Sequence, residues 1–200
     1  MRKQRKWNPK FFDHVVMRGN NRQDIFLDGR DVAAFFRVLH YTYEKYPFTI
    51  IAYCIMNNHY HLLIRSPEVQ LSKVMAYINR RYSEMFKKKY QYTGHLYESR
   101  YFSVMVITPR SLLKVSRYIH RNPIDTKTPM VKRMEDYPYS SFYLYKNSSN
   151  APYPFLDLEY LPTLLYKTHE KTSDAYCSYC EEEKDSEVPN SEENEKQSML

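Results

Sequence analysis

The sequence has few cysteines and no long apolar run. Only three cysteines occur in 200 residues, and Cys54 lies in an apolar segment, so the disulfide framework of a small secreted domain is absent. The longest apolar stretches are strand-sized, far short of the roughly 20 residues that cross a bilayer. Met1 begins a basic run and not a secretory signal. We therefore expect no membrane association, and a soluble protein of a reducing compartment.

Tyrosine and basic residues are abundant instead. The chain has 21 tyrosines, 10 phenylalanines and a formal charge of +7. Aromatic rings interleaved with Lys and Arg suit a phosphate backbone and stackable bases, although a solvated basic surface over an aromatic core fits the same composition. From Glu181 onward the charge is −6 and no apolar period exists, which predicts a disordered acidic tail. Residues 1–180 then carry +13, so the folded part is more basic than the whole chain.

The length predicts one domain with short additions. We expect a basic N-terminal arm over residues 1–10, the folded domain over 11–150, a loop-rich extension over 151–180, and the acidic tail over 181–200.

Apolar periodicity predicts the order strand, helix, strand, strand, helix, strand and a final helix. The expected strands are residues 12–18, 49–56, 59–66 and 101–107, and the expected helices follow Asp28, follow Pro67 and span 109–122. Asn57 and Asn58 tolerate positive φ and can close a tight hairpin between the second and third strands. This order indicates an α+β fold of ferredoxin-like type, in which a four-stranded antiparallel sheet carries its helices on one face and a C-terminal helix follows.

His59 and His61 stand at alternate positions of the third expected strand. Alternate side chains of a strand share a face, so the two imidazoles point the same way and Tyr60 points the other way. Such a pair can provide two ligands to one divalent metal ion. The alternative is an ordinary pair of buried or surface histidines.

The helix over residues 109–122 carries a tyrosine beside its buried face. The expected buried stripe is Leu112, Val115 and Ile119. Tyr118 lies off that stripe, and Asn122 is its neighbour on the same face at i+4. If this helix packs where the two histidines point, one pocket holds two imidazoles, an amide oxygen and a phenol.

Five segments, in order, resemble the single-tyrosine HUH (His, bulky residue, His) transposases, most closely the REP-associated tyrosine transposases and small insertion-sequence relatives. The segments are HVVMRGNNRQ (14–23), MNNHYHLLI (56–64), GHLYESRY (94–101), YIHRNP (118–123) and DYPYSSF (136–142). There are departures from the pattern of that family. Asn57 stands where proline is more usual, and Tyr60 stands where an aliphatic residue is more usual. Pro123 disfavours helical geometry at Asn122.

The resemblance implies a metal-dependent single-stranded DNA transposase or nickase. Such enzymes cleave and rejoin DNA at hairpin-bearing element ends or palindromic repeats through a covalent 5′-phosphotyrosine. The resemblance implies that Tyr118 is the nucleophile and that His59, His61 and Asn122 bind Mg²⁺ or Mn²⁺. It further implies a ferredoxin-like fold, a homodimer, a single-stranded or hairpin DNA partner, and a nucleoid-associated place in a bacterial cytoplasm.

The sequence also offers candidate DNA contacts and leaves two other functions open. Candidate DNA-binding residues are Arg18, Arg22, Arg80, Arg81, Arg100 and Arg121. A non-catalytic nucleic-acid-binding module, derived from such a transposase, is the alternative function, and a metal-dependent hydrolase that needs no Tyr118 is a weaker one. Cys177 and Cys180 form a lone CxxC with only His169 nearby, which disfavours a structural zinc site.

Overall fold

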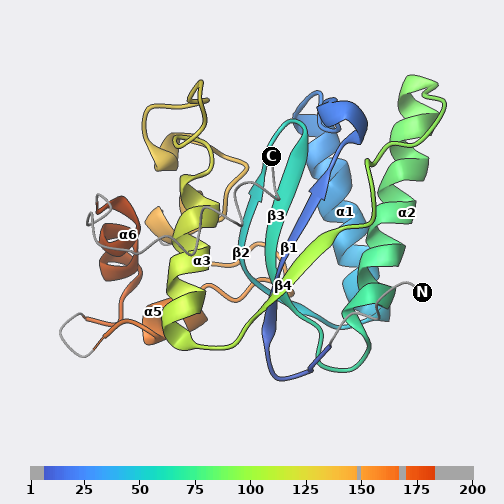
Figure 1. Cartoon of the computed structure of the whole chain (residues 1–200). Helices are drawn as coiled ribbons and strands as arrows, with labels where there is room; N and C mark the ends of the chain where they lie inside the picture. The colour runs from blue at the N-terminus through green and yellow to red at the C-terminus, as the bar shows by residue number, and fades with distance from the viewer. Residues whose placement is uncertain (1–6, 148–149, 167–169, 183–200) are drawn as a thin grey trace.

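The computed structural model describes residues 7–147, 150–166 and 170–182, and its centre is a four-stranded antiparallel sheet (Figure 1). The strands are β1 (Phe12–Arg18), β2 (Thr49–Ile55), β3 (His59–Arg65) and β4 (Phe102–Val106). They lie in the order β2-β3-β1-β4, with all neighbours antiparallel. The predicted ferredoxin-like fold is confirmed, and each strand ends within one residue of its expected bound.

Helices cover both faces of this sheet (Figure 1). One face carries α1 (Gly29–Lys45) and α2 (Leu71–Tyr90), which supply the two crossovers. The other face carries α3 (Pro109–Arg121) and the short helices that follow it. These are α4 (Phe142–Lys146), α5 (Tyr160–Thr163) and α6 (Ser173–Glu181), and two 3-10 turns complete the set, η1 (Asn20–Arg22) and η2 (Met134–Asp136). Among the described residues, no helix has the length and apolarity that crossing a bilayer requires.

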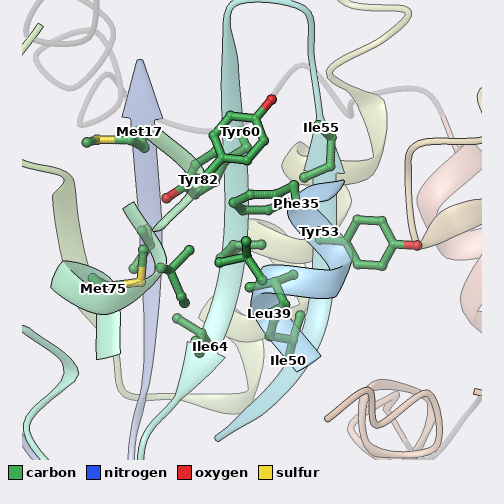
Figure 2. Packing of buried hydrophobic residues seen from close by; sticks show 14 of the residues in the cluster. Met17, Phe35, Leu39, Ile50, Tyr53, Ile55, Tyr60, Ile64, Met75 and Tyr82 are labelled. Carbon is green, nitrogen blue, oxygen red and sulfur yellow. The ribbon is translucent and has the colours of Figure 1, made fainter. Parts of the chain in front are cut away.

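The core between the sheet and α1/α2 is almost wholly apolar and rich in rings (Figure 2). Phe35 of α1 packs against Tyr60 of β3 and Tyr82 of α2, with centroids 4.8 and 5.4 Å away. Both phenols are satisfied, since Tyr60 donates to Asn79 Oδ1 and Tyr82 donates to the Ile25 carbonyl. Tyr60 therefore lies on the face opposite His61, as strand alternation predicts.

The core under α3 differs from the expected stripe. Leu112 and Ile119 are buried, but Val115 is only half-buried. The buried face of α3 also includes Leu113, Ser116 and His120, because α6 packs against a second side of this helix. Helical periodicity locates one buried stripe, and it does not reveal that a later helix will cover another.

The chain after α3 returns to β2. Tyr139 and Ser141 exchange backbone hydrogen bonds with Ile55 and Tyr53, at 2.9 and 3.0 Å. Farther along, Ile50 donates to Phe155 and accepts from Asp157 at 2.8 and 3.0 Å. Residues 139–141 and 155–157 thus cover the β2 edge of the sheet. Phe155 and Leu156 belong to the same core as α1, so the expected boundary at residue 150 does not separate two cores.

The two ends of the chain are described only in part. Trp7, expected in the basic arm, packs on the core and donates its indole N–H to the Ser66 carbonyl at 3.1 Å. Residues 1–6 of that arm and residues 183–200 of the expected acidic tail lie outside the described residues.

The β2–β3 hairpin closes at Asn57 and Asn58 as expected, but without positive φ at either residue. Neighbouring backbone holds this turn instead. Gly19 N–H donates to the Asn58 carbonyl, and the N–H groups of Ile25 and Phe26 donate to the Asn57 carbonyl. Positive φ falls on Asn21 and Arg22, in the turn that contacts the hairpin. A Cβ at Gly19 would lie 2.2 Å from the Gln23 carbonyl oxygen, so only glycine fits there.

Candidate active site

Two adjacent strands place three histidines on the α3 face of the sheet. His59 and His61 alternate along β3, and His61 pairs with Val16 of β1. His14 stands two residues before Val16 and shares that face. Its Nε2 lies 3.0 Å from His61 Nδ1, and the two rings stack with centroids 5.2 Å apart. The cluster therefore contains one imidazole more than the pair predicted from the sequence.

Helix α3 brings Tyr118 over this cluster. Thr108 caps the helix by accepting from Ser111 N–H, and Pro109 occupies its first turn, as predicted. The Tyr118 ring meets His61 edge-on, with centroids 5.6 Å apart and planes at 90°, and its centroid lies 5.9 Å from that of His14. Tyr118 is 40% exposed. A phenol accessible from solvent thus lies beside the histidines of its own chain.

Asn122 keeps helical geometry despite Pro123. Its φ and ψ are −48° and −43°, contrary to the expected departure from the helix. The reason is local, since the backbone N–H of Asn122 donates to the Ile119 carbonyl and its Nδ2 donates to the Tyr118 carbonyl at 3.0 Å. The side chain thereby satisfies the carbonyl that the last helical turn leaves free. Asn122 also interacts with the side chains of His59 and His61.

Each strand histidine has a hydrogen-bond partner at its Nδ1. His59 Nδ1 lies 2.6 Å from Asn58 Oδ1, which only accepts, so Nδ1 carries the hydrogen and Nε2 has the lone pair. His61 Nδ1 bonds to His14, and His61 Nε2 is buried without a hydrogen-bond partner among the described residues. If His61 donates through Nδ1, its Nε2 also presents a lone pair. An orphaned buried nitrogen beside a second imidazole and an amide oxygen fits a metal ion.

This donor set consists of two imidazoles and one amide. Within residues 7–147, 150–166 and 170–182, no group of three His, Cys, Asp or Glu side chains is arranged to hold a metal ion. Asn122, whose side chain interacts with both His59 and His61, is the candidate for a third protein ligand. The set has no carboxylate that would neutralise a cation.

Burial keeps the three imidazoles neutral. It lowers the pKa of His14 and of His59 to about 4, and it lowers the pKa of His61 well below its usual value. The positive charge of Arg18, which pairs with His59 across the strands, adds to this lowering for both His59 and His61. Neutral imidazoles at neutral pH are the form that coordinates a metal ion.

The phenol of Tyr118 is not activated by its surroundings alone. Burial raises its pKa, and Asn122 and Arg18 oppose that effect only in part. Among the predicted DNA-binding arginines, Arg18 is the one whose positive charge lowers the pKa of both His59 and Tyr118.

The other predicted arginines are distributed over the molecule. Arg22 and Arg100 are exposed on turns near the end of β1, and Arg100 lines an open cavity of about 440 Å³. Arg80 and Arg81 lie on α2, across the sheet from Tyr118, where Arg80 bonds to Glu84 at 2.8 Å. Arg121 is directed toward α6 and Asp125. The structure therefore brings only Arg18 of this set into the histidine cluster.

Sequence reasoning missed His14. His14 has no histidine at i+2, so its spacing along the chain does not mark it, yet it is buried against His61. The available signal was the alternation of β1, which puts His14 and Arg18 on one face. Only the strand register shows which residues of β3 they meet.

The CxxC forms no metal site among the described residues. Cys177 and Cys180 are buried and free on α6, and His169 lies outside the described residues. Burial raises the pKa of the Cys177 thiol to about 12, which agrees with a packing role.

Comparisons with known proteins bear on the family and the fold of this chain. The family model "Transposase IS200 like" matches residues 9–122, more than half of the chain. A Haemophilus influenzae protein classed as a REP-associated tyrosine transposase is 30% identical over 114 residues, which cover 51% of this chain and 63% of that relative. The chain thus spans less than two thirds of this curated relative.

Solved structures give the same fold. A REP-associated tyrosine transposase bound to a REP hairpin superposes with a TM-score of 0.61 at 15% identity, covering 76% of this chain and 88% of that chain. A Deinococcus radiodurans crystal structure described as a transposase reaches a TM-score of 0.42 at 15% identity over 60% of this chain and 97% of that one, too low to add to the argument. From the sequence match over residues 9–122, the chain belongs to the IS200-like transposase family.

Proposed function

We propose that this chain is a metal-dependent single-stranded DNA transposase or nickase in which Tyr118 is the nucleophile. One observation carries the proposal. A solvent-accessible phenol lies with its ring centroid 5.6 Å from that of His61, whose Nε2 is buried and unpaired among the described residues. A purely structural histidine cluster would satisfy that nitrogen. The family match supports the same activity.

The chain's own residues define the chemistry that Tyr118 performs. Its oxygen attacks the phosphorus of a phosphodiester, an O–P bond forms, and the bond from phosphorus to the 3′ oxygen breaks. The phenol proton passes to solvent, and the departing 3′ oxygen takes up a proton. The product is a 5′-phosphotyrosine and a free 3′-hydroxyl. The linkage retains the energy of the phosphodiester, so rejoining by the 3′-hydroxyl needs no ATP.

Tyr118 needs assistance because its environment raises its pKa from an ordinary value near 10. Mg²⁺ or Mn²⁺ bound by His59, His61 and Asn122 would supply a positive charge that polarises the scissile phosphate. His14 orients His61, Asn58 orients His59, and Asn122 links the ligand set to the backbone of Tyr118. Arg18 adds a fixed cation on the same face. Imidazole prefers softer ions than Mg²⁺, so Mn²⁺ suits this donor set at least as well.

The proposed substrate is single-stranded or hairpin DNA at an element end or a palindromic repeat. A tyrosine-rich basic chain suits base stacking and phosphate neutralisation. A relative of the same fold has been solved bound to a REP hairpin, which supports a hairpin ligand. The proposed homodimer is not needed to complete the site, because His14, His61 and Tyr118 of one chain already meet.

Covalent trapping tests the proposal. Labelled hairpin DNA is incubated with the protein in Mg²⁺, Mn²⁺ or EDTA, and protein–DNA adducts are resolved on a denaturing gel. We expect a metal-dependent adduct for the wild type and none for Tyr118→Phe. Tyr143→Phe is the matched control, because Tyr143 is 41% exposed but lies on α4, and it should leave the adduct unchanged.

Two outcomes would redirect the proposal. DNA binding without an adduct under any metal condition would favour the non-catalytic binding module. Cleavage that persists in Tyr118→Phe would favour hydrolysis by water, in which the tyrosine takes no covalent part.

A further inference from the structure

Helix α3 carries a fully buried histidine on the side away from Tyr118. His120 has 0% exposure and follows Tyr118 by two residues, which places it about 200° around the helix. Its ring is enclosed by three aromatic rings with centroids 5.6 to 5.8 Å away, those of Phe142, Tyr145 and Tyr176. The first two belong to α4 and the third belongs to α6.

Both nitrogens of His120 have partners outside α3. Its Nε2 lies 2.8 Å from Ser141 Oγ. Ser141 Oγ also accepts from Tyr53 N–H at 2.8 Å and lies 3.2 Å from the Tyr53 carbonyl oxygen. Nδ1 of His120 lies 3.3 Å from the Tyr176 hydroxyl oxygen and 3.9 Å from Cys180 Sγ. The His120 ring thereby connects α3 to α6 and, through Ser141, to β2.

Two more residues of α3 contact α6 on this side. Arg121 Nη1 donates to the Cys180 carbonyl at 3.3 Å, near the C-terminus of α6. The Arg117 guanidinium lies over the Tyr179 ring, 5.4 Å from its centroid. Figure 1 shows α6 beside α3, away from the sheet. The contacts all fall on positions that leave Tyr118 and Asn122 free to face the histidines.

We propose that His120 and Ser141 are positioning residues that set the rotation of α3 about its axis, and with it the placement of Tyr118 and Asn122. This inference rests on the proposed role of Tyr118. A phenol oxygen lies roughly 9 Å from the helix axis, so a rotation of about 10° moves it by about 1.5 Å. A misplacement of about 1 Å at a reacting atom can cost roughly 100-fold in rate.

The polarity of this contact distinguishes it from ordinary packing. Apolar side chains would fill the space under α3 and tolerate small rotations, whereas a hydrogen bond specifies distance and direction. Ser141 lies in the DYPYSSF segment that resembles the family, whereas Tyr176 lies beyond that segment and beyond the family match, which ends at residue 122. Residues of the C-terminal third, Ser141 and Tyr176, therefore contact α3 on the side opposite Tyr118.

Adjacent serines provide a matched pair for the test. Ser140 and Ser141 are both fully buried and both approach the Tyr53 carbonyl, but only Ser141 bonds to His120. Ser140 Oγ accepts from Phe142 N–H instead. The variants Ser140→Ala and Ser141→Ala are made in the full-length protein. Each is assayed for hairpin-DNA affinity, for the single-turnover rate of adduct formation, and for thermal stability.

We expect Ser141→Ala to lower the adduct rate roughly 10- to 100-fold with hairpin affinity within about twofold of wild type. Ser140→Ala should keep the wild-type rate after correction for the folded fraction. Equal effects of the two variants, in proportion to their stability, would overturn the proposal and leave the contact a purely structural one.

A spectroscopic readout separates this inference from the proposed function. The Tyr118 ring lies against the rings of His61 and His14, so ring currents shift its NMR resonances. In ¹³C-tyrosine-labelled protein, assigned with Tyr118→Phe, Ser141→Ala should move the Tyr118 signal and Ser140→Ala should leave it in place. This result would support positioning even if no adduct forms, and an unmoved signal in Ser141→Ala would refute it.

Variants of His120 give a second measure. Gln places an amide nitrogen near the position of Nε2 and can still donate to Ser141, whereas Leu cannot. His120→Gln should therefore retain more of the adduct rate, and more of the native Tyr118 signal, than His120→Leu. If both variants fold and lose these properties equally, the hydrogen bond to Ser141 is not the positioning contact.

Discussion

The two faces of the sheet are built differently although they share the same strands. Toward α1 and α2 the sheet presents an apolar, ring-rich core in which Phe35, Tyr60 and Tyr82 pack together. Toward α3 it presents buried polar groups, including His14 and His61. β3 serves both faces, since Tyr60 belongs to one and His61 to the other. One face supplies the burial that stabilises the fold, and the other bears the cost of burying imidazoles.

Substitution of neighbours on β3 should separate these roles most strongly. His61→Gln removes a ring whose Nε2 we assign to the metal ion, and we expect adduct formation to fall at least about 1,000-fold. Tyr60→Phe removes only the hydrogen bond to Asn79, so it should cost about 1 kcal/mol of stability and leave adduct formation intact. Gel trapping and urea denaturation measure the two effects. A Tyr60→Phe protein that is folded but inactive would contradict the assignment of stability to one face of the sheet and activity to the other.

The pH dependence of stability tests a charged exception on the apolar side. Asp13 is 5% exposed and shares the α1/α2 face with Val15, and burial raises its pKa to about 6 from an ordinary 3.8. The folded state thus holds the proton more tightly than the unfolded chain. The stabilisation from the protonated form is complete below about pH 3.8 and is lost as the pH rises through 6, by up to roughly 3 kcal/mol.

Asp13→Asn should remove that dependence and be the more stable protein above pH 7. Urea midpoints of both proteins from pH 4 to pH 8 measure the difference. Parallel profiles for wild type and variant would show that Asp13 is ionised without penalty.

On the polar side, His14 should act through His61. His14→Phe keeps a ring in the stack but removes the nitrogen bonded to His61 Nδ1. Loss of such a supporting hydrogen bond typically weakens metal affinity roughly 10- to 100-fold. Titration with Mn²⁺ followed by electron paramagnetic resonance measures that affinity without any DNA. Unchanged Mn²⁺ binding would mean that His14 only fills space beside His61.

The smallest expected effect concerns arginines on the two faces. Arg18→Gln removes the cation that acts on His59 and Tyr118, and we expect weaker hairpin binding with a salt slope reduced by about 1. Arg80→Gln, across the sheet, breaks only an exposed pair with Glu84 and should change hairpin affinity less than about twofold. Binding titrations between 50 and 200 mM salt, which span roughly the range where counterion release is measurable, compare the two variants. Equal losses would show that DNA also contacts α2.

The sequence itself determined much of this protein. Period-2 alternation put His59 and His61 on one face and Tyr60 on the other, and helical spacing put Tyr118 beside Asn122. Caps at Asp28 and Thr108 fixed where α1 and α3 begin. These features depend on residues close in the chain, so a local pattern reports them.

The tertiary structure decided what depends on residues far apart. His14 reaches His61 only through the register of β1 on β3, which no local pattern encodes. His120 is enclosed because α4 and α6 return from residues 142–181 to cover α3. Strand register and helix packing are set by the sum of many weak contacts, and those exist only once the whole chain has folded.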